Sequence, residues 1–139
     1  MLSSLLFFIV LNLQAQTIKS VCASGCDYTL SQLQTAIDDA QGSTRIIEIA
    51  AGATATQTDS VVLRNHSGFT LIRSSKIYNL PGNTRVSPSQ ASDMATITVT
   101  TVVPIVKVDL GAKNYAFEGI RFAPPSGSYV ETMIITYAQ

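Results

Sequence analysis

The chain has 139 residues, a formal net charge of +0, a hydrophobic fraction of 46% and a charged fraction of 13%. This length predicts one domain, since a domain typically takes about 100–200 residues. The balanced charge excludes a mainly electrostatic interaction with nucleic acid or with an anionic membrane surface. The hydrophobic fraction and the absence of net charge exclude an intrinsically disordered chain. We therefore expect an ordered protein, and the abundance of Ser and Thr favours β-structure.

The N-terminus, residues 1–15, resembles an export signal. Residues 5–13 (LLFFIVLNL) form an apolar run that is too short for a bilayer, which takes about 20 residues. Ala15 supplies a small residue for cleavage. A buried N-terminal helix and an uncleaved anchor remain alternatives, because no Lys or Arg precedes the run. We predict a signal peptide at 1–15 and a secreted mature chain, 16–139, extracellular or periplasmic, without a membrane span.

Cys22 and Cys26 are the two cysteines of the chain. An even pair in an exported protein predicts a disulfide, and Gly25 gives so short a loop the backbone freedom that it needs. Two free thiols are the alternative. A zinc site is disfavoured because His66 is the single histidine, and redox pairs more typically use the spacing C-x-x-C.

The first predicted element is a helix at residues 29–41. Its apolar residues recur at helical spacing and form one narrow face: Leu30, Leu33 and Ile37. Thr29 and Gln32 fit a capping box at the start of this helix. Gly42 is the expected stop at its end.

The remaining chain is predicted to form short strands separated by turn residues. The candidate strands are rich in β-branched and aromatic residues and are bounded by Gly, Pro, Asn or Ser. They are expected at 45–50, 60–63, 69–73, 95–101, 105–110, 115–122 and 133–137, with a loop at 79–88. The spacing of their apolar residues leaves a solenoid and a sandwich equally open.

Three stretches form a set when they are read in order. Residues 27–40 (DYTLSQLQTAIDDA) lead into the strand and Gly turn of 45–52 (RIIEIAAG), and residues 115–122 (YAFEGIRF) place a Gly between an aromatic strand and an Ile-x-Phe strand. This set resembles the secreted right-handed parallel β-helix proteins of the pectin-lyase-like superfamily. The resemblance implies an all-β fold, a right-handed single-stranded parallel β-helix (a solenoid) with an N-terminal capping α-helix.

Two departures from that family pattern bear on the length of the protein. Where the family often has Gly-Asp before the first strand, this chain has Gly42-Ser43-Thr44-Arg45. After the last predicted strand only Ala138 and Gln139 remain, although a solenoid needs a polar cap at each end. We therefore expect a truncated β-helix, with 16–139 forming the N-terminal cap and the first rungs of a domain that continues beyond the chain.

The resemblance implies a polysaccharide-acting protein. Such enzymes use acidic clusters on the outer face of the coil, either to hold Ca²⁺ or as an acid–base pair. The acidic residues after the first strand are instead well separated: Asp59, Asp93, Asp109, Glu118 and Glu131. We therefore assign no catalytic residue, no metal ligand and no cofactor site to this segment, and expect Ca²⁺ only in a downstream part.

The predicted function is accordingly that of the N-terminal portion of a secreted protein similar to pectate lyases and polygalacturonases. This segment would cap and nucleate the coil, without a complete active site, and the expected partner is an extracellular polysaccharide rather than nucleic acid. The alternative is a non-enzymatic extracellular β-helix adhesin or structural module. Whether the protein is an enzyme is left open by the sequence.

Several smaller features leave a functional and a structural interpretation open. Asp38 and Asp39 are adjacent on the predicted helix and are either a solvated face or a cation site. The basic stretch is either solvated or an anion contact, with His66 exposed in a turn: Arg64, His66, Arg73 and Lys76.

The last strands and one turn carry three further features. Glu118 and Arg121 are expected to be exposed ion-pair partners worth a few tenths of a kcal/mol. The aromatic residues either pack inward or stack on sugars: Tyr115, Phe117 and Phe122. Asn65-His66-Ser67 fits the acceptor pattern for N-glycosylation in a eukaryotic host.

Overall fold

The computed structural model describes most of the chain after the predicted signal peptide, which itself lies outside the described residues. These residues are mostly β, with short strands, one short α-helix and a few 3₁₀ turns. The described residues are 16–40, 42, 44–82, 84–125 and 134–136.

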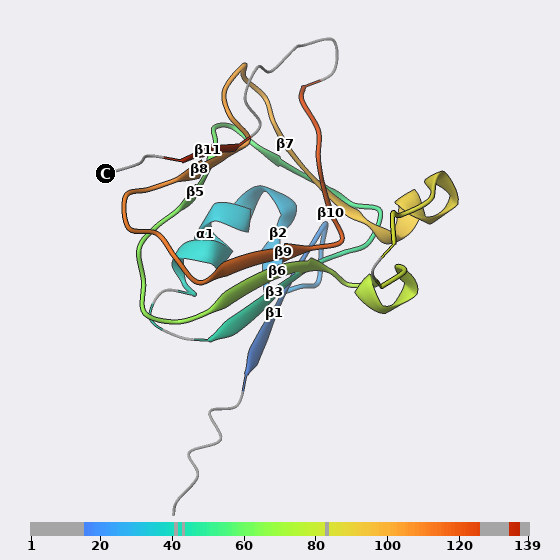
Figure 1. Ribbon diagram of the computed structural model, residues 1–139, viewed down its shortest axis with the longest axis horizontal. Coiled ribbons are helices and arrows are strands. Elements are labelled where there is room, and N and C mark those ends of the chain that lie inside the picture. Colours follow the sequence, from blue (N-terminus) through green and yellow to red (C-terminus); the bar gives the residue numbers. More distant parts are fainter. Residues whose placement is uncertain (1–15, 41, 43, 83, 126–133, 137–139) are drawn as a thin grey trace, which may run out of the picture.

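The strands form three sheets in which every pair of neighbours is parallel (Figure 1). Sheet A has the order β2-β1-β3-β6-β9, with β1 (Thr17–Cys22), β2 (Tyr28–Thr29), β3 (Arg45–Ile49), β6 (Thr70–Ser74) and β9 (Tyr115–Glu118). Sheet B has the order β10-β7-β4, with β4 (Thr54–Gln57), β7 (Ala95–Val99) and β10 (Ile120–Phe122). Sheet C has the order β11-β8-β5, with β5 (Val61–Leu63), β8 (Val106–Val108) and β11 (Ile134–Thr136).

The chain visits the three sheets in a fixed rotation. After β1 and β2, the strands β3, β4 and β5 lie in sheets A, B and C, and the next two sets of three repeat that order. Ile72 of β6 is in register with Ile47 of β3 and with Phe117 of β9. Side chains that point inward therefore stack on the equivalent side chains of the neighbouring strands. An all-β protein was expected, and the mostly β architecture with parallel sheets agrees with it.

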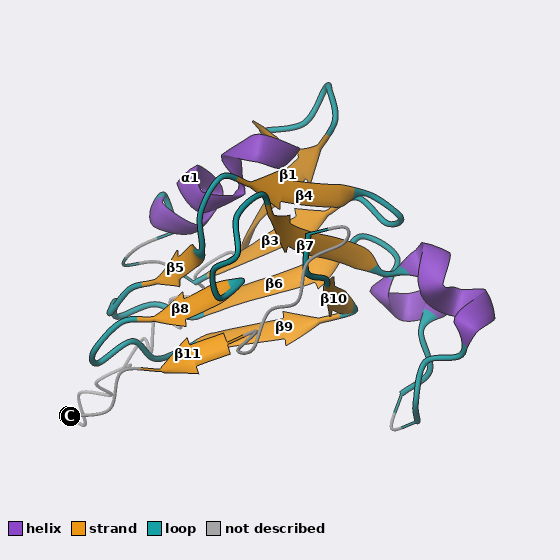
Figure 2. Ribbon diagram, turned by 90° about the horizontal axis from the view of Figure 1, so that it is seen from above, coloured by secondary structure: helices purple, strands orange, loops and turns teal. Residues whose placement is uncertain are grey.

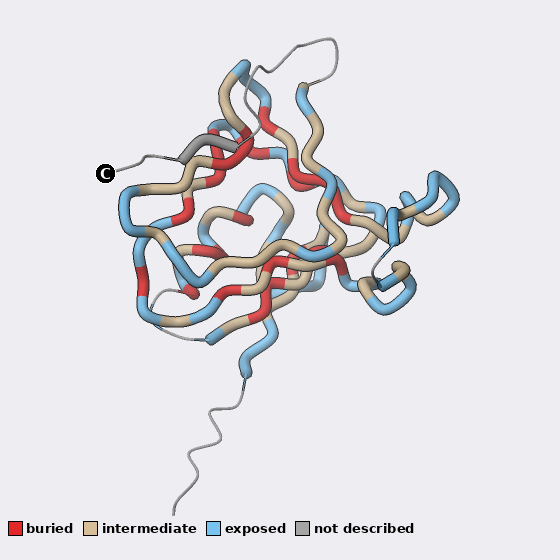
Figure 3. The backbone as a smooth tube through the Cα atoms, viewed as in Figure 1, coloured by how far each residue is buried: buried red, intermediate tan, exposed pale blue. Residues whose placement is uncertain are grey.

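The core lies between the three sheets, and Figure 3 shows buried stretches along the inside of each. Apart from Thr70, the largest fully buried side chains of the strands are aliphatic: Val21, Ile47, Ile49, Ile72, Ile97, Val61, Val99 and Val106. Each side chain of this size contributes about 1.5–3 kcal/mol when it leaves water. This single cluster holds the three sheets together, because it takes members from all of them.

The predicted helix, 29–41, is shorter in the structure. A 3₁₀ turn, η1 (Leu30–Gln32), leads into α1 (Leu33–Asp38), and the last predicted residue, Gln41, lies outside the described residues. The capping box is confirmed, since the backbone N–H of Thr29 donates to Oε1 of Gln32 at 2.9 Å. Figures 1 and 2 show α1 at one end of the sheets, within the outline that the three sheets enclose. Its buried residues join the core: Leu33, Ala36 and Ile37.

The strand predictions miss three elements and merge two others. β1, β2 and β4 were not predicted, because none of these segments shows a clear alternation of apolar and polar residues, and β2 is only two residues long. Residues 115–122, predicted as one stretch with an internal Gly bend, are two strands in two sheets, β9 and β10, separated by Gly119 at φ 62°. The predicted loop at 79–88 is the central part of a longer connection, 75–94.

Candidate functional site

The connection between β6 and β7, residues 75–94, projects from the corner where these two strands meet (Figures 1 and 2). It contains two 3₁₀ turns, η2 (Ile77–Asn79) and η3 (Pro88–Asp93). Connections longer than about 12–15 residues are uncommon in compact domains and usually carry function. We therefore take this connection and the adjoining outer face of sheet A as the candidate site.

Polar contacts tie the two ends of the connection together. The hydroxyl of Ser74 donates to the carbonyl oxygen of Asp93 at 2.5 Å, and Nζ of Lys76 lies 3.6 Å from Oδ1 of the same residue. Further out, Nε2 of Gln90 donates to the carbonyl oxygen of Asn79 at 3.4 Å. The connection is thus closed at its base and braced between its two turns.

Charged side chains form a row on the outer face of sheet A beside the connection. Glu48, Arg73 and Glu118 occupy equivalent positions on β3, β6 and β9. Nη2 and Nε of Arg73 donate to Oε2 of Glu48 at 2.9 and 3.1 Å. The carboxylate of Glu118 has no ion-pair or hydrogen-bond partner among the residues that the structure describes.

Tyr78 of η2 lies over this row. The Cζ atom of Arg73 is 5.5 Å from the centre of the Tyr78 ring, and Nη1 of Arg73 donates to the Tyr78 hydroxyl at 3.4 Å. Burial opposes the positive charge of Arg73, but the hydrogen bonds to Glu48 and Tyr78 outweigh this effect and raise its pKa. Tyr78 is itself 85% exposed, so a planar aromatic face is presented to solvent next to a fixed cation.

A hollow of about 430 Å³ lies further along the same connection. Its lining combines one guanidinium group with mainly apolar side chains: Arg85, Val86, Ser87, Pro88, Ala91 and Met94. The Ser87 hydroxyl is engaged with Gln90 at 3.0 Å in a capping box. The hollow is open to solvent and belongs to the same connection as Tyr78.

The described part of the row on sheet A does not bring two free carboxyl groups together. Hydrolysis of a glycosidic bond uses two carboxyl groups, one as acid and one as base or nucleophile. In the row on sheet A, Glu48 is neutralised by Arg73, which leaves Glu118 alone. Within the described ranges, no group of three or more His, Cys, Asp and Glu side chains converges as a metal site.

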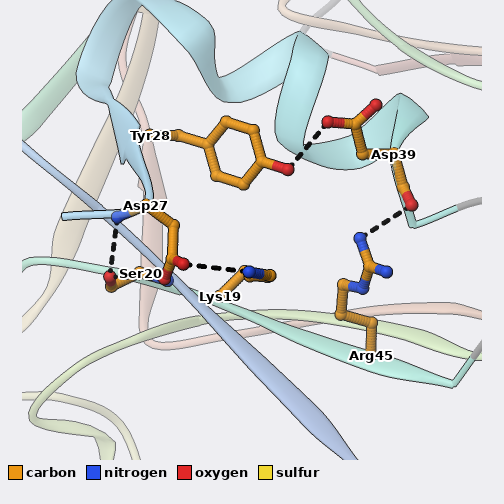
Figure 4. Close-up of polar contacts among 6 residues, drawn as sticks. All are labelled: Lys19, Ser20, Asp27, Tyr28, Asp39 and Arg45. Carbon is orange, nitrogen blue, oxygen red and sulfur yellow. Dashed lines mark hydrogen bonds and ion pairs between the residues drawn. The ribbon is translucent and has the colours of Figure 1, made fainter.

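A second polar cluster lies at the α1 end of the molecule, beside β1 and β2 (Figure 4). The Asp27 carboxylate accepts the backbone N–H of Ser20 at 2.9 Å and Nζ of Lys19 at 2.9 Å. These bonds, led by the backbone N–H, hold the pKa of Asp27 well below its usual range. The Tyr28 hydroxyl donates to Asp39 at 2.7 Å, which raises the pKa of Tyr28.

At the same end of the molecule, Gln34 of α1 binds the backbone of β5 in sheet C. Its Oε1 accepts the backbone N–H of Val62 at 2.8 Å, and its Nε2 donates to the carbonyl oxygen of Val62 at 3.1 Å. The side-chain amide therefore satisfies the backbone of β5 on the side where no further strand pairs. An edge strand treated in this way offers fewer groups to other chains.

The predicted disulfide between Cys22 and Cys26 is present, with the two Cα atoms 5.8 Å apart. Gly25 in this loop has φ 78°, a conformation that glycine adopts without strain. The loop joins β1 to β2 and places Asp27 against β1. The cysteines thus belong to the scaffold of the α1 end.

The predicted acidic and basic candidates do not form a shared site. Asp38 pairs with Arg64, and Asp39 accepts the Tyr28 hydroxyl. Arg73 and Lys76 are paired with Glu48 and Asp93, as described above. Glu118 and Arg121 do not pair as predicted, since Nε of Arg121 donates to Oγ1 of Thr96 at 3.1 Å. Glu131 lies outside the described residues.

His66 is buried, which corrects the prediction of an exposed turn residue. Only 8% of the residue is exposed, and its ring contacts the Tyr115 ring edge-on, with centroids 4.7 Å apart. Nδ1 is buried without a hydrogen-bond partner in the described residues, and Nε2 lies 3.5 Å from Oγ1 of Thr70. Burial lowers the pKa of His66 because the charged imidazolium loses solvation.

The predicted inward packing of the late aromatic residues is confirmed. Tyr115, Phe117 and Phe122 are half-buried and pack against the core. The rings of Phe117 and Phe122 meet edge-to-face, with centroids 5.3 Å apart. These rings therefore contribute to the packing of the core.

Sequence reasoning missed Tyr78, Glu48 and Gln34 as site residues. Glu48 and Arg73 occupy matched positions in successive strands, and an alignment of β3 with β6 would have revealed this relation. Tyr78 and Gln34 carry no comparable signal, because their roles depend on contacts between segments that are distant in sequence.

Among the described residues, none of the helices has the length and apolar character to cross a bilayer. Comparisons of the chain with protein-family models, with curated proteins and with solved structures give no match.

Proposed function

We propose that this chain is the N-terminal, capped part of a right-handed parallel β-helix in an exported polysaccharide-acting protein of pectin-lyase type. In this proposal the segment closes and nucleates the coil and contributes a binding surface for an extracellular polysaccharide. The catalytic groups, and any Ca²⁺ that they use, belong to a downstream part. The fixed rotation of strands among three parallel sheets supports the coil.

The contrast between the two ends of the sheets supports the capping role. At the α1 end, Leu33 and Ile37 are fully buried, Gln34 satisfies the edge of β5, and Asp27 bonds to the backbone of β1. At the other end, the inward side chains of β9 and β10 are only half-buried: Tyr115, Phe117, Ile120 and Phe122. Apolar side chains of that kind favour the stacking of a further turn of the coil.

Tyr78 is the observation that carries the proposed function. Tyr78 is 85% exposed, so its ring offers a ligand a large apolar area with a hydroxyl group at its end. The ring is fixed by its contact with Arg73 and by a connection that is closed at its base. A flat apolar face beside fixed polar groups matches a sugar ring, which has apolar C–H faces and hydroxyl groups at its edge.

Affinity electrophoresis of the secreted chain in gels that contain acidic or neutral plant-type polysaccharides tests this function. We expect at least one polysaccharide to retard the protein, and Tyr78→Ala to abolish most of the retardation. Val102→Ala is the matched control, since Val102 is also exposed but lies in the connection between β7 and β8. Circular dichroism of each variant checks that the fold is unchanged.

The alternative, a non-enzymatic module that serves as a rigid presentation surface, predicts a different result. The wild-type chain would then migrate equally in all gels, and Tyr78→Ala would change nothing. Equal loss of retardation in Tyr78→Ala and Val102→Ala would also contradict a binding surface at Tyr78.

A further inference from the structure

The turn between β5 and β6, residues 64–69, contains the tripeptide Asn65-His66-Ser67, of which only the middle residue is buried. Asn65 and Ser67 are exposed, whereas His66 between them is buried against Tyr115. Asn65-His66-Ser67 has the form Asn-x-Ser that oligosaccharyltransferases recognise. His66 therefore anchors the turn, and the two residues that such an enzyme reads face solvent.

The side-chain amide of Asn65 is not committed to the fold. It makes no hydrogen bond within the part of the chain that the structure describes. It lies against Gly111, where a Cβ atom would come within 3.3 Å of Asn65 Nδ2. Gly111 has φ 76°, so the backbone there already favours glycine. Modification of the amide would break no internal hydrogen bond among the described residues.

Two exposed apolar side chains belong to the two segments that meet at Asn65. Phe69, at the end of the same turn, is 41% exposed, and Leu110, next to Gly111 in the chain, is 55% exposed. The neighbouring charged residue Arg64 is already paired with Asp38. A hydrophilic group at Asn65 would cover apolar surface that the protein itself leaves open.

The position is also separate from the proposed polysaccharide surface. The turn with Asn65 precedes β6, whereas the connection that carries Tyr78 follows it. The two features therefore lie at opposite ends of the same strand, and a bulky group at Asn65 leaves the surface around Tyr78 accessible.

We propose that Asn65 is the acceptor of an N-linked glycan that shields Phe69 and Leu110. The donor is a lipid-linked oligosaccharide pyrophosphate in a eukaryotic export compartment. A bond forms between Asn65 Nδ2 and C1 of the first sugar, and the bond from C1 to the phosphate oxygen breaks. The lipid pyrophosphate leaves, and the amide nitrogen gives up one proton. The inference rests on the predicted export of the chain and is independent of polysaccharide binding.

Cell-free translation of the full chain with eukaryotic microsomes tests this proposal. Protection from added protease reports translocation, and a mass shift removed by peptide N-glycosidase reports the glycan. We expect the wild-type chain to be protected and to show the mass shift. Peptide N-glycosidase hydrolyses the glycosylated amide, so residue 65 should be Asp after the glycan is released. Asn65→Gln and Ser67→Ala should abolish the shift, and Ser67→Thr should retain it.

Asn79→Gln is the matched control, because Asn79 is exposed but is followed by Leu80 and Pro81, which is no acceptor pattern. It should leave the shift unchanged. A chain that is protected from protease but not shifted overturns the proposal while export stands. A chain that is not protected overturns the expected export and the glycan with it. A shift that persists in Asn65→Gln contradicts the assignment to Asn65.

Discussion

Gly119 lies against Leu80 so closely that a Cβ atom on Gly119 would approach Leu80 Cδ1 to 2.9 Å. The Cδ1 atom of Ile77 would be 3.1 Å from the same position. Gly119 forms the bend between β9 and β10, and Leu80 belongs to the connection between β6 and β7. The bend between β9 and β10 therefore packs directly against the connection that carries the candidate site.

Gly119→Ala is expected to destabilise the protein by about 1–3 kcal/mol, because φ 62° strains a residue that has a Cβ. The displaced Leu80 adds to this cost. Gly82→Ala is the control, since Gly82 has no atom within 4 Å of its Cβ position. Chemical denaturation of both variants measures the difference. Equal stabilities would show that the bend tolerates a side chain.

Leu33→Ala is expected to cost about 2–5 kcal/mol, because Leu33 is fully buried where α1 covers the core. Leu110→Ala removes the same atoms from an exposed site and should change the free energy of unfolding by no more than about 0.5 kcal/mol. Urea titrations followed by circular dichroism compare the two. Similar losses would mean that α1 contributes no more to the core than a surface turn does.

Asp27→Asn is expected to lower the free energy of unfolding at neutral pH and to reduce the loss of this free energy as the pH becomes acidic. The pKa of Asp27 is lowered in the folded state, so its stabilising contribution is present above the ordinary carboxyl pKa of about 3.9. That contribution is lost as the pH falls through and below this range. Asp109→Asn is the control, since the Asp109 side chain makes no ion pair or hydrogen bond within the described residues. Unfolding free energies from about pH 7 to about pH 3 decide the point, and parallel curves for Asp27→Asn and wild type would contradict it.

His66→Phe is expected to remove a pH dependence near neutrality. Burial lowers the pKa of His66 in the folded state, so the unfolded chain takes up its proton first as the pH falls below about 6.5. The stability of the wild-type protein should therefore decrease over this range. Phe preserves the edge-on contact with Tyr115 but does not titrate. Thermal unfolding of both proteins across this range should give diverging curves, and a constant difference would exclude His66 as the cause.

The sequence alone was sufficient for features that depend on local chemistry. Thr29 and Gln32 form the predicted capping box, and Cys22 and Cys26 form the predicted disulfide. Gly119 marks a real bend because its positive φ is a local requirement. In each case the residues that interact are close in the chain, so spacing and residue type carry the information.

The register between strands could not be predicted from the sequence. Ile47 pairs with Ile72 and Leu71 pairs with Ile46, but both segments carry two adjacent apolar residues, so their pattern does not distinguish this register from one shifted by a residue. A shift of one residue exchanges the inner and outer faces of a strand, which hid the relation between Glu48 and Arg73. The connection at 75–94 further disrupts the period, so no simple repeat length could restore the alignment.

The candidate site was not accessible from the sequence for a related reason. His66 looked like a solvated turn residue because its neighbours are polar, yet the Tyr115 ring reaches it from a later strand. Tyr78 became a site candidate only through its contact with Arg73 and through the bond between Ser74 and Asp93 that closes the connection at its base. Such relations arise only once the strands have stacked.

The amide of Gln34 imitates a peptide unit, since it offers one acceptor and one donor to Val62 as a neighbouring strand would. Gln34 covers only one residue of β5, and no second residue continues this pairing, because Gln34 belongs to the helix α1. Any strand that tried to join sheet C at this edge would first have to displace both bonds. The β5 edge of sheet C is consequently closed to a further strand at Val62.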